Sequence, residues 1–433
     1  MQATRCAIPA ALVCALLAPL YAQTSTTDNA DADIGALVQT ALERNREIQA
    51  ARVRMTEAQA LVRQAGMRPN PTLEMQGGTG RPLATKGEEE FSTGYSQALE
   101  LGGKRDKRVK VAETSVELAR AEVDERGRLL GFDVRSRAIE ALSKKEKARV
   151  LEKLAQLNEQ ALRLTQARAQ EGDIPRLDVQ LLQVEQTRNE AQRTAIEGQL
   201  DADLSDLRRL LTLDASAAVT LGNTLPPNAR EMALQELREL ALRERPDLRI
   251  ARLLQTQGNA EVTLAQAQAR PDVTLSLRYS HKNSAFDQLG LSSTGTPIPI
   301  RDRDDVVLFG ASLPLFTGRR NQGNIDAAAA RASATSLRVE HLASTIPLEV
   351  ETAYKRWRAA KNTLAVFGRG VVEQSERNLE VIRQAYQLGQ LRLLDVLNEQ
   401  RRLTETELAY IDAKTDLARA VVELERAAGA PLP

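Results

Sequence analysis

A long proline-free stretch is the feature that most limits what this chain can fold into. The sequence has no proline from Leu83 to Ile174, and between Phe132 and Glu171 it has no glycine either. A helix that begins near Lys104 can therefore run for about 70 residues, or roughly 100 Å at about 1.5 Å per residue. No compact domain has such a diameter, so the sequence favours rods.

The composition of the chain supports the same conclusion. Only 3% of the 433 residues are aromatic and 27% are charged, which indicates helix surface rather than thick globular cores. The 59 Lys and Arg residues are balanced by 58 Asp and Glu residues. Because no global basic field results, nucleic acid is not expected as a partner.

The N-terminal residues predict export. An apolar stretch from Ala7 to Leu20 follows Arg5, which is the pattern of a signal peptide over residues 1–22, and a flexible N-terminal tail is expected over residues 23–33. Both cysteines lie in the cleaved segment, so the mature chain has no disulfide and no cysteine metal ligand. Whether the N-terminus carries a lipid stays open.

The sequence contains an internal duplication. Residues 41–65 match residues 241–265 at a shift of 200. The identical pairs are Ala41/Ala241, Leu42/Leu242, Ala51/Ala251, Arg52/Arg252, Thr56/Thr256, Ala60/Ala260, Val62/Val262 and Ala65/Ala265. We therefore predict two repeats, 34–222 and 231–428, and a C-terminal tail at 429–433. Each repeat should contain a helix, a strand pair, a very long helix, a tight turn and a further helix.

The long helices should pack through narrow apolar seams. Apolar residues recur at 3-4 spacing in three places, which is typical of helices that bury one stripe against partner helices. These seams are Val150, Leu154, Leu157, Ala161 and Leu164; Leu200, Leu204, Leu207 and Leu211; and Tyr410, Ala413, Leu417 and Ala420. Pro347 lies inside the later long helix, where we expect a kink or a short break.

Two strand pairs, at 71–101 and 272–316, have one apolar and one polar face. Val273, Leu275, Leu277 and Tyr279 alternate with polar residues, and the same period runs less cleanly through 91–99 and 307–315. Arg278 and Glu100 are expected on the inner, wet faces. The polar segments Gly80–Glu90 and His281–Asp305 are expected to be outer loops. Strands of about 10 residues match tilted membrane-crossing β-segments.

Four strands cannot close a barrel in lipid. Unpaired backbone groups at an open edge have no water to bind there, so several chains must combine. Three chains would supply twelve strands, an even number within the known range for outer-membrane barrels.

The order and duplication of several short motifs resemble the TolC-like outer membrane factor family. The resemblance extends from about Ile34 to Ala428. The motifs are Arg68-Pro-Asn-Pro, Arg270-Pro-Asp, Leu101-Gly-Gly-Lys-Arg, Pro314-Leu-Phe-Thr-Gly-Arg-Arg-Asn-Gln-Gly-Asn, Tyr386-Gln-Leu-Gly and Leu394-Asp-Val-Leu-Asn-Glu-Gln.

The resemblance implies a mainly α fold with a small β part. The chain would form a homotrimer, with a 12-stranded transmembrane β-barrel in the outer membrane of a Gram-negative bacterium that continues into a 12-helix periplasmic α-barrel. It would be a passive exit duct docked to a periplasmic adaptor protein and an inner-membrane RND pump. Glu100-Leu-Gly-Gly-Lys-Arg and Asn321-Gln-Gly-Asn are most similar to the branch that serves cobalt, zinc and cadmium efflux. Ducts for multidrug efflux or type I protein secretion share the same body.

Two turns are candidate adaptor contacts. Both turns have a glycine suited to a left-handed helix cap and an acid near the next helix start, so helix capping alone also explains them. The resemblance implies that these hairpin tips meet the adaptor, and the two interpretations are compatible. The candidate residues are Gly172, Asp173, Leu177 and Asp178 at the first tip, and Gly389, Gln390, Leu394 and Asp395 at the second.

Glu373, Glu376 and Glu380 approach the second tip along one helix. Three chains would bring three copies of each toward the axis, and carboxylate rings can select cations or close a pore. A solvated outer helix face is the alternative interpretation.

We expect no cofactor and no resident metal. His281 and His341 are the only histidines, and a metal site needs several converging ligands. The sequence contains no Gly-x-Ser-x-Gly, His-Glu-x-x-His or phosphate-loop motif. An exported hydrolase is therefore a remote alternative. A soluble periplasmic coiled-coil adaptor or scaffold is another, but an adaptor would normally have one helical hairpin rather than two.

Overall fold

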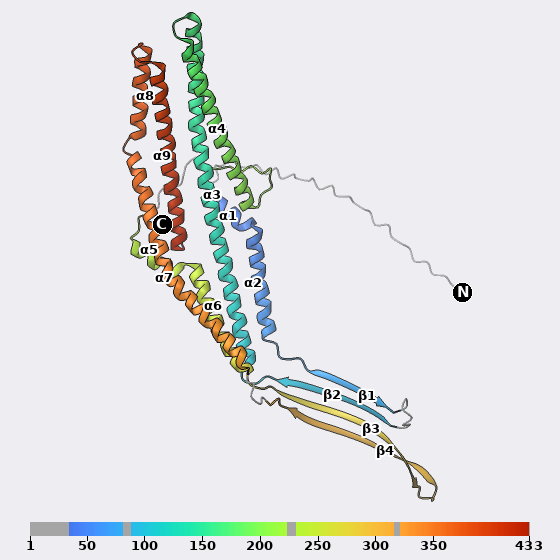
Figure 1. The fold of residues 1–433 in the computed structure, drawn as a ribbon. Coiled ribbons are helices and arrows are strands. Elements are labelled where there is room, and N and C mark those ends of the chain that lie inside the picture. The colour runs from blue at the N-terminus through green and yellow to red at the C-terminus, as the bar shows by residue number, and fades with distance from the viewer. Residues whose placement is uncertain (1–33, 81–87, 223–230, 316–320, 433) are drawn as a thin grey trace, which may run out of the picture.

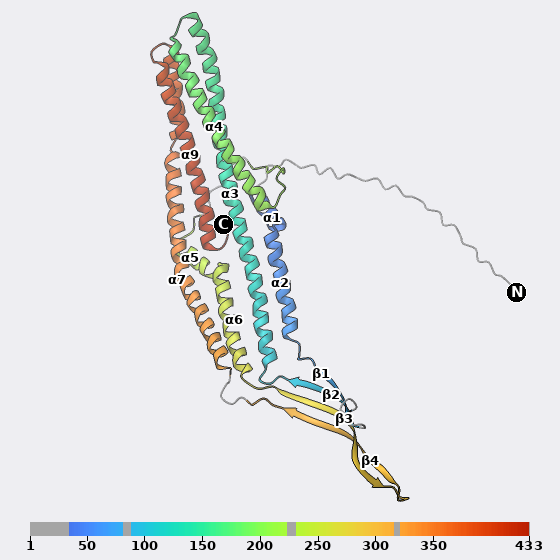
Figure 2. The ribbon, with the colours of Figure 1, turned by 45° about the vertical axis from the view of Figure 1, so that its right-hand side comes forward.

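The computed structural model describes residues 34–80, 88–222, 231–315 and 321–432. The predicted signal peptide and N-terminal tail lie outside these residues, as does most of the predicted loop Gly80–Glu90. The described part is elongated: long helices run side by side, and a sheet projects from one end of them (Figure 1). The view in Figure 2 shows the same end-to-end arrangement.

The two halves of the chain repeat one order of elements. The first half comprises α1 (Ile34–Arg44), α2 (Arg46–Ala65), β1 (Thr72–Thr79), β2 (Glu89–Leu99), α3 (Lys104–Glu171) and α4 (Arg176–Leu211). The second half comprises α5 (Leu234–Glu244), α6 (Pro246–Gln268), β3 (Val273–Leu291), β4 (Pro297–Ser312), α7 (Gln322–Phe367), α8 (Val371–Gln387) and α9 (Leu393–Ala428). With 68 residues, α3 confirms the long unbroken helix predicted from Lys104.

Corresponding residues of the two halves build corresponding cores. Leu37 and Ala41 are buried between α1 and the long helices, and Leu237 and Ala241, 200 residues further on, are buried in the second half. The first core includes residues of α3 and α4, and the second includes residues of α7 and α9. The duplication seen in the sequence is therefore a duplication of packing.

The opening helix of each half is broken into two. The Asn45 side chain accepts hydrogen bonds from the backbone N–H groups of Glu47 (2.9 Å) and Ile48 (3.3 Å), and thereby begins α2. In the second half the break falls at Arg245, and Pro246 begins α6, where its missing N–H removes no helical bond. Our expectation of a single helix in these places missed this break.

The four strands form one antiparallel sheet in the order β1-β2-β3-β4. β2 pairs with β3 although the helices α3 to α6 separate them in sequence, so the sheet joins the two halves of the chain. One row of partners across the sheet is Leu73, Tyr95, Leu277 and Phe309.

The predicted outer loop His281–Asp305 is wrong. β3 and β4 extend through most of it, and the turn is confined to the residues around Gly295, which has φ 78°. Polar side chains do not prevent pairing, because the ladder bonds are made by the backbone. An irregularity in register between Ala285 and Leu289 interrupts the extended hairpin.

The later long helix is interrupted elsewhere than we expected. α7 continues through Pro347 to Phe367, so the short break that we considered there does not occur. The helix ends instead at Phe367, and Gly370, with a φ of 88°, is the residue that precedes α8. A positive φ is accessible to glycine at little cost, which makes this residue a natural break.

One predicted seam is offset. Leu164 is 65% exposed, whereas Leu151, Leu154, Asn158 and Thr165 are buried along α3. The buried stripe thus contains polar residues, which a search for apolar spacing cannot detect. The seams that end in Leu207 and Leu211 and in Leu417 and Ala420 are buried at these positions. None of the helices in the described residues combines the length and apolarity needed to cross a membrane.

Candidate functional site

One face of the sheet is apolar and exposed. Phe309 is 83% exposed, and Leu73, Tyr95 and Leu277 of the same row are also exposed. The neighbouring row contains Met75, Thr93, Tyr279 and Val307. In water, so much exposed apolar surface on adjacent strands is unfavourable, and it indicates a lipid or protein partner.

The opposite face of the sheet is polar. Thr72, Ser96 and Ser276 lie in one row. In the next row, Arg278 Nη2 donates a 3.1 Å hydrogen bond to Glu74 Oε2. Arg278 therefore lies on the polar face, where we expected it. Glu100 was placed wrongly: it follows the end of β2 and pairs with Arg108 of α3, because the chain turns there into the helix.

The junction of sheet and helices is held by charges. Asp272, which precedes β3, forms a salt bridge with Lys104 Nζ at 2.7 Å. Its carboxylate also accepts a 2.9 Å hydrogen bond from the Leu101 N–H. Lys104 begins α3, so Asp272 fixes the start of the long helix of the first repeat to the strands of the second.

Both helical hairpins end in glycine turns at the end opposite the sheet (Figure 1). Gly172 has φ 85° and Gly389 has φ 74°, and both glycines are exposed. The Asp173 N–H donates to the Arg168 carbonyl (3.0 Å), and the Gln390 N–H donates to the Ala385 carbonyl (2.9 Å). These bonds satisfy carbonyls at the two helix ends, so the local sequence explains both turns.

Acidic residues begin the helices that follow the turns. The Asp395 carboxylate accepts a 3.0 Å hydrogen bond from the Arg392 N–H, and Asp178 lies in the first turn of α4. Leu177 and Leu394, which precede these acids, are 60% and 51% exposed. The tips therefore present exposed leucines beside exposed glycines.

The two tips lie close together. Leu182 of α4 is buried against Leu393 and Leu397 of α9. Burial raises the pKa of Tyr386 in α8, and the nearby negative charge of Asp178 raises it further. Hence the two hairpins of one chain meet near their ends.

The three glutamates of α8 are exposed. Glu380 accepts a 3.0 Å hydrogen bond from the Gln384 amide, and none of Glu373, Glu376 and Glu380 makes an ion pair with a residue that the structure describes. Burial raises the pKa of Glu407 in α9, and Glu376 raises it further, so these two carboxylates are neighbours.

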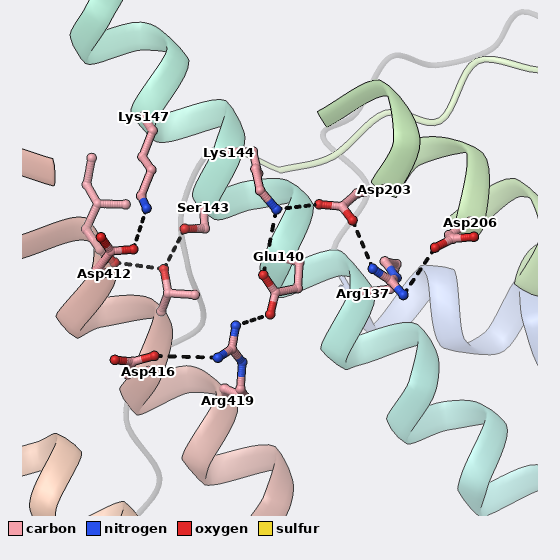
Figure 3. Close-up of polar contacts among 12 residues, drawn as sticks. Arg137, Glu140, Ser143, Lys144, Lys147, Asp203, Asp206, Asp412, Asp416 and Arg419 are labelled. Atoms are coloured by element: carbon pink, nitrogen blue, oxygen red, sulfur yellow. Dashed lines mark hydrogen bonds and ion pairs between the residues drawn. The ribbon is translucent and has the colours of Figure 1, made fainter. Parts of the chain in front are cut away.

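A charge network that the sequence reading missed ties the hairpins together further from the tips (Figure 3). Lys144 of α3 contacts Asp203 of α4 at 2.9 Å, and Arg137 contacts Asp203 at 2.9 Å. On the other side of α3, Glu140 pairs with Arg419 of α9. Further contacts in the network are Arg137–Asp206, Lys147–Asp412 and Ser143–Thr415.

Complementary charges at helical spacing were the available signal for this network. Residues 137, 140, 144 and 147 lie on neighbouring turns of α3, and residues 412, 416 and 419 do so on α9. Taken alone, each set is indistinguishable from a solvated helix face.

The histidines do not come together. His281 Nδ1 lies 2.7 Å from Asp305 Oδ1 on neighbouring strands, whereas His341 lies inside α7. In the described residues, no three His, Cys, Asp or Glu side chains are grouped so that they could hold a metal ion.

The fold defines a class of protein in which a small membrane-type sheet continues into paired helical hairpins. Comparison with family models matches residues 37–212 and 237–430 to the outer membrane efflux protein family. The chain belongs to this family, and it is an outer membrane protein.

Relatives and solved structures agree with this assignment. The cobalt-zinc-cadmium resistance protein CzcC of Cupriavidus metallidurans is 24% identical, over 89% of this chain and 87% of that protein. The outer membrane efflux protein BepC of Brucella suis is 23% identical, over 91% of this chain and 84% of that protein. The CmeC outer membrane channel of Campylobacter jejuni superposes with a TM-score of 0.73 at 14% identity, covering 94% and 87% of the two chains.

Proposed function

We propose that three copies of this chain form the exit duct of a tripartite heavy-metal efflux system. The observation that carries the proposal is the four-stranded sheet, which has one exposed apolar face and two outer strands, β1 and β4, without a further partner among the described strands. In lipid such edges must be paired. Three sheets joined edge to edge would place the apolar faces on lipid and the polar faces, with Arg278, on a water-filled lumen.

Cargo is the finer part of the proposal. Similarity to a cobalt-zinc-cadmium resistance protein over most of both chains supports heavy-metal cations. Because no described cluster of side chains could hold a metal ion, we assign the choice of cation to the inner-membrane pump and treat this chain as a passive conduit.

The hairpin tips are the proposed docking points for a periplasmic adaptor. They lie at the end far from the sheet, and their exposed leucines, Leu177 and Leu394, offer apolar contacts beside the left-handed glycines Gly172 and Gly389. In a trimer, Glu373, Glu376 and Glu380 could form a carboxylate ring near the second tip. Such a ring would act on cations electrostatically, by raising their local concentration.

A deletion strain tests the cargo. It is grown on zinc, cadmium, cobalt and copper salts, and in parallel on dyes and detergents. Heavy-metal efflux predicts greater sensitivity to the salts, restored by the gene on a plasmid. Sensitivity to dyes and detergents alone would instead identify a multidrug duct.

A further inference from the structure

A narrow cavity of about 80 Å³ lies between the two hairpins, where α4 faces α9. Asn189 of α4 lines it, and Gln400 and Arg401 of α9 lie opposite. The side chains of Glu185 and Glu405 complete its polar wall. The cavity lies between the apolar contact at the tips and the charge network of Figure 3.

Buried hydrogen-bond donors in and beside this cavity have no acceptor among the residues that the structure describes. Asn189 is 5% exposed, and its Nδ2 has no partner; the Arg401 Nε is likewise buried without one. Asn158, 1% exposed on α3, accepts a 2.7 Å hydrogen bond from the Gln400 amide, but its own Nδ2 is unpaired. Buried polar groups are rarely left unpaired, so these donors call for a bound acceptor.

The charges around the cavity decide the kind of acceptor. Glu185 of α4 accepts a 3.1 Å hydrogen bond from Arg401 Nη2 and lies 3.9 Å from Arg188, which also lines the cavity. Glu405 of α9 adds a second carboxylate, so the two arginines leave no net positive charge for an anion. A cation would face the N–H groups. Water alone can accept from Asn189 and Arg401 and also donate to a carboxylate or to the Gln400 carbonyl oxygen.

We propose that the cavity binds a cluster of two or three ordered water molecules, which bridge α4 and α9. One water molecule needs about 10–15 Å³ of such cavity volume, so a cavity of about 80 Å³ has room for two or three. The existence of the water site does not depend on the proposed function.

A crystal structure of the full-length protein in detergent, at a resolution that shows individual waters, tests the site directly. We expect water density within hydrogen-bond distance of both Asn189 Nδ2 and Arg401 Nε. An empty cavity would overturn the proposal. A crystal soaked in bromide serves as the second arm, and an anomalous peak in the cavity would identify an anion site instead.

Two variants at one residue provide a test in solution. Asn189→Leu displaces the water and leaves Arg401 Nε without an acceptor, whereas Asn189→Ala leaves room for another water. We therefore expect the Tm to fall by more in Asn189→Leu than in Asn189→Ala. A dry cavity predicts the reverse order, because leucine would fill it and alanine would enlarge it. Gln183→Leu, at an exposed position of the same helix, measures the effect of leucine alone.

Discussion

The Lys144 ammonium of α3 lies 2.9 Å from the Asp203 carboxylate of α4, whose side chain is only 9% exposed. Arg137 contacts the same carboxylate, so a single nearly buried acid serves two cations. Because Glu140, one turn from Lys144, pairs with Arg419 of α9, α3 joins the two repeats through a continuous set of charges.

Asp203→Asn should destabilise the helical body. The amide cannot match two cations, and hydrogen bonds to charged groups contribute about 1.5–3 kcal/mol each, part of which Arg137 keeps through Asp206. We expect a loss of roughly 1–3 kcal/mol, measured by chemical denaturation. Asp201→Asn, at an exposed position on the same helix, is the control, and equal stability of the two variants would contradict a structural role for the network.

Glu407 makes a prediction about pH. Burial raises the pKa of Glu407, Glu376 raises it further, and Lys153 opposes the rise. Between the ordinary and the raised pKa the folded state binds more protons than the unfolded state, so stability falls as pH rises through this window. Glu407→Gln should therefore raise the Tm at neutral pH, with a gain that shrinks on acidification. Glu190→Gln, at an exposed position, should show no such trend.

Gly389→Val should impair efflux and leave the assembly intact. At φ 74° the substitution strains the backbone by about 1–2 kcal/mol, but nothing lies within 4 Å of a new Cβ, so the effect stays at the tip. Gly103 is a matched control. It has a φ of 69° and equally open space around a new Cβ, but it lies at the start of α3, far from the tips. Metal tolerance that falls equally in Gly103→Val would argue against a contact role for the tip.

Phe309→Arg should reduce insertion of the protein in the outer membrane. Phe309 lies on the apolar face, where a cation facing the bilayer centre costs about 2–4 kcal/mol. Gln76→Arg, at an exposed position on the polar face, should be tolerated. The amount of heat-modifiable protein in outer-membrane fractions measures both. Greater loss in Gln76→Arg would invert the assignment of faces.

The rods and the alternating strands could be predicted from the sequence because each leaves a periodic local signal. The start of α3 at Lys104 follows from a glycine pair and a long proline-free run, and the duplication follows from identical residues at a fixed shift. The extent of β3 and β4 could not be predicted, because backbone pairing continues through polar residues.

The candidate site was only partly accessible from the sequence. The tip glycines were recognised from cap chemistry, which is local. The pairing of Asp203 with Lys144 and the buried Asn158–Gln400 contact both depend on which helix faces which. Asn158 and Gln400 are 242 positions apart, so no local sequence pattern connects them. Glu100 was misplaced for a similar reason, since its partner Arg108 is defined by a turn in the chain rather than by strand period.

The number of chains per particle in detergent tests the central claim most directly. The full-length protein is extracted from outer membranes, and its mass is measured by light scattering with the detergent contribution subtracted. Because each chain has four strands with open edges, we predict three chains per particle. We also expect the protein to precipitate when the detergent is removed. A single chain released by osmotic shock and stable in buffer alone would contradict the account.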